Sequence, residues 1–121
     1  MAITREFAAS FAAEWIAAWN ARDLPGVLSH YTNDFEMSSP LIIELAAEPS
    51  GGLRGKEKIQ AYWQAALKKH PGLHFELLGV FVGANSVVLH YRRNLGQPAA
   101  EAFFFNEQGL AYRAAAHYQK K

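Results

Sequence analysis

The second half of the sequence reads as a run of strands separated by short turns. Turn-forming sequences recur there as GANS (83–86), NLGQP (94–98) and NEQG (106–109). Turn signals spaced by about ten residues are typical of an antiparallel meander. Four strands are therefore expected, with the sequences LHFELLGVFV (73–82), VVLHYRR (87–93), AAEAFFF (99–105) and LAYRAAAHY (110–118).

The first half is expected to be mostly helical. Aromatic residues recur every four positions at Phe7, Phe11, Trp15 and Trp19, which gives one helix a broad apolar face. Thr4 can cap that helix, and Asp23 can cap a short second helix with Pro25 in its first turn. A third helix, KEKIQAYWQAALKKH (56–70), places its apolar residues along one face: Ile59, Tyr62, Trp63, Ala66 and Leu67.

The segment between the second and third helices is expected to be extended. Strand character begins at Phe35, Pro40 interrupts it, and LIIEL (41–45) is a β-branched, apolar run of the kind found in strands. Ser39 is either a simple strand end before Pro40 or a hydrogen-bond donor to a ligand. Helices come first and strands later, so the chain is predicted to form one α+β domain over residues 1–121.

Composition excludes several classes of function. Half of the 121 residues are hydrophobic and 13% are aromatic, which favours a globular core over disorder. The net charge is +1 with no basic stripe, so no nucleic-acid partner is expected. There is no cysteine, no apolar run long enough for a membrane span, and no secretory pattern in MAITREF, so a cytoplasmic protein is expected. The five histidines show no metal-ligand spacing, and neither a metal nor a cofactor is predicted.

Three stretches carry a family resemblance: WIAAWNARDLPGVLSHYTNDFEMSSP, GLRGKEKIQAYWQAAL and NEQGLAYRAAAHY. Together they resemble the SnoaL-like members of the nuclear transport factor 2-like superfamily, which includes ketosteroid isomerases, polyketide cyclases and scytalone dehydratase. The resemblance implies a cone, in which a curved, mixed, mostly antiparallel sheet wraps three N-terminal helices around an apolar pocket. It also implies a homodimer that pairs the outer faces of two sheets.

Strand alternation divides the predicted strands into two faces. The resemblance to ketosteroid isomerases implies that three of these sets lie inside: Glu101, Phe103 and Phe105; Tyr112, Ala114, Ala116 and Tyr118; and Leu89, Tyr91 and Arg93. The outward set expected at the dimer interface is Val88, His90, Arg92, Ala102, Phe104, Arg113, Ala115 and His117. The predicted ligand-pocket residues are Trp15, Trp19, Tyr31, Ser39, Tyr62, Tyr91, Phe103, Ala116 and Tyr118.

The resemblance to ketosteroid isomerases places Ser39 on their general base, Trp15 on an oxyanion-binding tyrosine, and Glu101 on a protonated acid. A serine cannot take a proton from carbon unaided and an indole has no acidic hydroxyl, so that mechanism is disfavoured. Glu101 is a lone carboxylate in an apolar strand. It is either a desolvated acid with a raised pKa or a carboxylate that pairs with Arg93 or faces solvent. His74 can assist Glu101 if its side chain points inward, which a bulge at Gly79 would decide.

Two functions follow from these residues. The first is binding of a small apolar or partly polar molecule in an aromatic-lined pocket. The alternative is a cofactor-independent enzyme, an isomerase, dehydratase, cyclase or hydrolase, with Glu101 as its acid or base and His74 in support.

Overall fold

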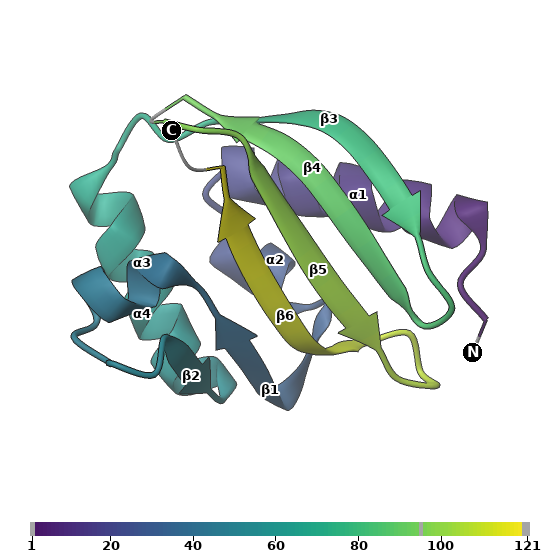
Figure 1. Ribbon diagram of the computed structural model, residues 1–121, viewed down its shortest axis with the longest axis horizontal. Helices are drawn as coiled ribbons and strands as arrows, with labels where there is room; N and C mark the ends of the chain where they lie inside the picture. The colour runs from purple at the N-terminus through teal and green to yellow at the C-terminus, as the bar shows by residue number, and fades with distance from the viewer. Residues whose placement is uncertain (1, 95, 120–121) are drawn as a thin grey trace.

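The structure is a computed structural model that describes residues 2–94 and 96–119. These residues form a curved six-stranded sheet and four helices, which confirms the predicted α+β class and the cone-like wrapping of sheet around helices (Figure 1). The elements in chain order are α1 (Arg5–Asn20), α2 (Leu24–Leu28), β1 (Tyr31–Ser38), α3 (Pro40–Leu45), β2 (Gly52–Arg54), α4 (Lys56–Lys69), β3 (Phe75–Val82), β4 (Ser86–Arg93), β5 (Ala99–Phe105) and β6 (Ala111–Tyr118).

The strands lie in the order β2-β1-β6-β5-β4-β3. The predicted meander β3-β4-β5-β6 is antiparallel throughout, whereas β1 runs parallel to β6 and antiparallel to β2. In Figure 1, α1 crosses behind β3 and β4, and α3 and α4 lie together at the opposite side of the molecule. The inner face of the sheet therefore has helices on two sides, with the core between them.

Helix α1 begins where the sequence predicts. The hydroxyl of Thr4 accepts a hydrogen bond from the N–H of Phe7 and caps the first turn. At the other end, the side chain of Asn20 donates to the carbonyl of Phe75 at 2.9 Å and accepts from its N–H at 2.8 Å. This two-way pairing joins the end of α1 to the start of β3. It fixes the aromatic rings of Trp19 and Phe75 against each other, with centroids 5.6 Å apart.

The segment LIIEL is not a strand, which corrects the prediction. Residues Pro40–Leu45 form helix α3, because Ser39 in an extended conformation accepts a hydrogen bond from the N–H of Leu41 and Pro40 occupies the first turn. Ile42 is fully buried, whereas Ile43 and Leu45 are exposed. The capping signal at Ser39-Pro40 thus outweighs the β propensity of a short apolar run.

Strand β6 contains a bulge that the alternation rule missed. Phe104 pairs with Arg113 but Phe105 pairs with Ala111, so Tyr112 has no partner on β5. Its side chain is 41% exposed rather than inward as predicted. After the bulge the predicted alternation holds: Ala114 and Ala116 are buried and Tyr118 faces the pocket. The predicted faces of β4 and β5 are also confirmed.

Candidate functional site

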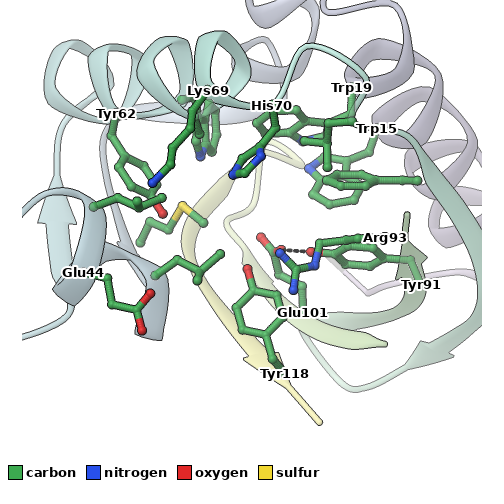
Figure 2. A pocket seen from close by; sticks show the side chains of 17 residues that line it. Trp15, Trp19, Glu44, Tyr62, Lys69, His70, Tyr91, Arg93, Glu101 and Tyr118 are labelled. Carbon is green, nitrogen blue, oxygen red and sulfur yellow. Dashed lines mark hydrogen bonds between the residues drawn. The ribbon is translucent and has the colours of Figure 1, made fainter. Parts of the chain in front are cut away.

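A pocket of about 330 Å³ opens between the sheet, α3 and α4 (Figure 2). This volume is at the lower end of the range for small-molecule sites. Helices α1 and α4 supply indole and phenol rings, and α3 supplies the aliphatic Leu41 and Leu45. The polar groups come from strands β4, β5 and β6, from Glu44 on α3, and from Lys69 and His70 at the end of α4. The lining residues are Trp15, Trp19, Met37, Leu41, Glu44, Leu45, Tyr62, Trp63, Ala66, Lys69, His70, Leu73, Phe75, Tyr91, Arg93, Glu101 and Tyr118.

Most of the predicted pocket residues reach this cavity. The predicted residues that line it are Trp15, Trp19, Tyr62, Tyr91, Tyr118 and Glu101. Four others lie just behind its wall. Tyr31 is buried and accepts a hydrogen bond from the indole N–H of Trp15, and the ring of Phe103 packs 5.3 Å from that of Trp15. Ala116 is the register partner of Glu101 on β6, and Ser39 caps α3.

Glu101 is the only buried carboxylate among the described residues, with 2% of its surface exposed. The hydroxyl of Tyr91 donates to its Oε1 atom at 2.9 Å (Figure 2). Burial raises the pKa of Glu101 to about 7, although the hydrogen bond from Tyr91 opposes this shift. The carboxyl group therefore changes protonation state near neutral pH, which is the range in which a side chain can both give and accept a proton.

Arg93 does not neutralise Glu101. Its guanidinium carbon lies 4.2 Å from the centre of the Tyr118 ring, a cation–π arrangement. The Nε atom is buried without a hydrogen-bond partner, and no carboxylate of the described residues lies within salt-bridge distance. Of the two readings of Glu101, the structure therefore supports the desolvated acid rather than the ion pair.

Three tyrosines line the pocket as neutral hydrogen-bonding groups. Burial is the largest cause that raises the pKa of Tyr62, Tyr91 and Tyr118, and the charge of Glu101 adds to it. Hydrogen bonding with the Ser39 hydroxyl opposes the rise at Tyr62 and Tyr118. All three phenols remain protonated at neutral pH, so each keeps an O–H that can donate to a neighbour or a ligand.

His74 lies outside the pocket. Its side chain is exposed, and its backbone N–H is held by the Oδ1 atom of Asn94. The bulge in β3 occurs between Leu77 and Gly79, beyond His74, so it does not turn the imidazole inward. The histidine that faces the cavity is His70, at the end of α4, and Figure 2 shows its ring pointing into the cavity.

Several lining residues were missed by sequence reasoning. Leu41, Glu44 and Leu45 reach the pocket because α3 is a helix, and the Ser39-Pro40 start signal was the clue to it. Lys69 and His70 reach the pocket from the end of α4. The stop at Pro71-Gly72 places them where the helix meets the wide end of the cone.

Among the described residues no cluster of His, Asp or Glu is arranged to hold a metal ion. None of their helices is long and apolar enough to cross a membrane.

A curved sheet that wraps helices around an apolar pocket is the fold that this chain shares with the solved SnoaL-like proteins described below. Residues 12–121 match the SnoaL-like domain, and the chain belongs to that family. No curated protein matches the sequence.

Three crystal structures show how widely the fold is shared. A SnoaL-like protein of unknown function from Burkholderia thailandensis E264 is 50% identical, with 99% of this chain and 100% of that chain covered and a TM-score of 0.95. A candidate isomerase of the SnoaL-like family from Agrobacterium tumefaciens is 19% identical, with 95% and 99% covered and a TM-score of 0.75. A candidate polyketide cyclase from Sinorhizobium meliloti is 13% identical, with 89% and 94% covered and a TM-score of 0.73. The last two similarities concern the fold alone.

Proposed function

We propose that this protein binds a small, largely apolar molecule whose polar end meets Glu101. The observation that supports this most strongly is a buried carboxyl group on the wall of an aromatic pocket, without a cation to pair it. Burying a carboxyl group away from water destabilises the fold, and carboxyl groups buried in this way are concentrated at functional sites. Indole and phenol rings supply apolar contact area on most of the remaining wall.

The protonated form of Glu101 explains how a polar end is recognised. One carboxyl oxygen already accepts from Tyr91, so a neutral Glu101 keeps one O–H to donate. A carbonyl or hydroxyl oxygen of the ligand would accept it. In a water-poor pocket such a hydrogen bond orients the ligand, while the rings of Trp15, Trp19 and Trp63 enclose its apolar part.

A second function, cofactor-independent acid–base catalysis, is favoured by the pKa of about 7 at Glu101. Isomerisation, dehydration, cyclisation and hydrolysis each need a group that gives or takes a proton at neutral pH. The ketosteroid isomerase arrangement itself is not supported, because the hydroxyl of Ser39 caps α3 instead of acting as a base.

A fragment screen tests the binding proposal. We expect ligand-observed NMR with a library of small aromatic compounds to give hits, and the Ala66→Phe variant, which fills the pocket, to lose them. Ala17→Phe is the matched control, because Ala17 is exposed on α1 and lines no part of the pocket. A library without a single hit that depends on Ala66 would overturn the proposal. If the screen gives hits that depend on Ala66, native mass spectrometry of protein taken from cells is the next step to identify the natural ligand.

We also propose that two copies pair through the outer face of the sheet. The predicted outward set is on that face, and the register of β3 adds Phe81 beside Val88, with 59% of its surface exposed. Arg113 covers the ring of Phe104 only loosely, at 5.6 Å from its centre. An apolar strip of this kind on a sheet face is typical of a two-fold interface.

A further inference from the structure

We infer that the ligand of this pocket carries a carboxylate and that Arg93 is its anchor. This inference rests on the proposed binding function and narrows it to aromatic or largely apolar carboxylic acids. It follows from the position of Arg93, from the balance of charge on the pocket wall, and from the shape of the cavity.

Arg93 is placed to meet a ligand rather than another part of the chain. It lies at the end of β4 on the same face as Tyr91, two residues away, and it lines the pocket. Stacking on Tyr118 holds the guanidinium group in place. Its Nε–H is buried out of a ligand's reach, so the terminal Nη groups are the donors that a ligand in the pocket would meet. A carboxylate is the group whose two oxygens match the parallel N–H donors of arginine.

The balance of charge on the wall favours the same ligand. The charged and titratable side chains that face the cavity, besides the tyrosines, are Glu44, Lys69, His70, Arg93 and Glu101. Glu44 is exposed on α3 and lies across the cavity from Arg93 (Figure 2). Glu101 is uncharged when protonated, so Lys69 and Arg93 then face one exposed carboxylate. A negative group entering beside Arg93 meets an attractive field.

The shape of the rest of the cavity limits the apolar part of the ligand that carries the carboxylate. Arg93 and Tyr118 lie at one end, and the indole rings of Trp19 and Trp63 lie 5.0 Å apart on the helical wall. A flat apolar body fits between these surfaces when its acidic end is at Arg93. A neutral Glu101 can donate to the same carboxylate, which would explain why an acid and a cation line one pocket without pairing with each other.

Matched pairs of probes separate the charge of a ligand from its shape. Benzoate and benzamide, 2-naphthoate and 2-naphthamide, and biphenyl-4-carboxylate and its amide differ within each pair mainly in charge. At pH 6 we expect the carboxylate of at least one pair to bind about tenfold more tightly than its amide, as measured by calorimetry. Arg93→Met should remove this preference and retain binding of the amide, which also reports that the pocket is folded. Arg93→Lys keeps the charge but loses the parallel N–H donors and the stacking on Tyr118, so it should retain only part of the preference.

Arg92→Met is the matched control, since Arg92 is the next residue along β4 and its exposed side chain pairs with Glu76 instead. This variant should bind carboxylates as the wild type does. Equal affinity for carboxylate and amide in all three pairs, or a preference that survives in Arg93→Met, would overturn the inference and leave the binding proposal standing. A wild-type protein that binds neither these probes nor any fragment of the library would overturn both.

Discussion

Tyr91 and Glu101 are diagonal neighbours on the inner face of the sheet. Tyr91 pairs in register with Ala99 and Glu101 pairs with Leu89, so the phenol reaches across two positions to donate a hydrogen bond to the carboxyl group. The small side chain of Ala99, opposite Tyr91 on this face, leaves room for that reach. The hydrogen bond joins two polar groups that are both buried.

The first prediction concerns this hydrogen bond. Because the bond from Tyr91 holds the pKa of Glu101 down, Tyr91→Phe should raise that pKa above about 7. The ring keeps its contacts with Trp15 and Phe75, so the loss of stability should be only about 1–3 kcal/mol. Carbon-13 NMR of the glutamate carboxyl groups follows the titration. Tyr112→Phe, at an exposed position, is the control, and an unchanged pKa in Tyr91→Phe would contradict the prediction.

The second prediction concerns the stability of the fold against pH. The unfolded chain releases the Glu101 proton near pH 4.5, whereas the folded chain holds it until about pH 7. Between these values the folded state binds more protons, so the free energy of unfolding falls as pH rises and levels off above about pH 7. For a buried group with this shift, the loss is on the order of 3 kcal/mol.

Glu101→Gln should remove that dependence. The variant and the wild type should have similar stability at pH 5, and the variant should be the more stable at pH 8, as judged from urea midpoints. Glu57→Gln changes an exposed carboxylate on α4 and should keep the wild-type slope. If Glu101→Gln instead lost several kcal/mol at pH 8, Glu101 would be ionised against a buried cation, contrary to the geometry at Arg93.

The third prediction concerns the start of α3. Ser39→Ala removes the oxygen that accepts from the N–H of Leu41 and should cost about 0.5–2 kcal/mol. Because α3 is short, the loss should appear first as faster hydrogen exchange at the amides of residues 41–45. Ser38→Ala alters the exposed neighbour and should leave those exchange rates as they are. Exchange rates that are equal in both variants would show that the cap is not what holds α3.

The fourth prediction concerns assembly. Light scattering at micromolar concentration should give twice the mass of one chain for the wild type. For the Phe104→Glu variant, which places a charge on the outer sheet face, it should give the mass of a single chain. Retained tryptophan fluorescence would show that this variant is still folded. Ile43→Glu introduces the same charge at an exposed apolar position of α3, away from the sheet, and should remain dimeric. A wild-type chain that scatters as a monomer would refute the interface.

The sequence predicts those parts of the molecule in which local signals agree with one another. Aromatic spacing and the caps at Thr4 and Asp23 specify α1 and α2, and turn residues specify the meander. Strand alternation places Tyr91 and Arg93 on one face of their strand, and the family resemblance places that face and the side of Glu101 inside the cone; all three residues line the pocket. The sequence left open whether Glu101 is buried or faces solvent, and the structure buries it.

What the sequence does not reveal depends on local signals that compete or on contacts between distant segments. LIIEL is both a good strand sequence and a good short helix after Ser39-Pro40, and periodicity cannot decide over six residues. Tyr112 turns outward because of a bulge that no residue type marks. The position of the Arg93 guanidinium depends on the ring of Tyr118, on which it stacks. This is a tertiary contact between two strands, and no local signal predicts it.

The position of β6 in the sheet has a consequence for how the chain folds. This strand comes last in chain order, yet it lies between β1 and β5. A nascent chain can form α1 and the β3–β4–β5 meander, but β1 and β5 keep unpaired edges until residues 111–118 arrive. Pairing β1 with β6 closes a loop across most of the sequence, and such contacts slow folding. The pocket is therefore among the last features to appear, because a nascent chain that stops short of β6 lacks Tyr118 and that part of the pocket wall.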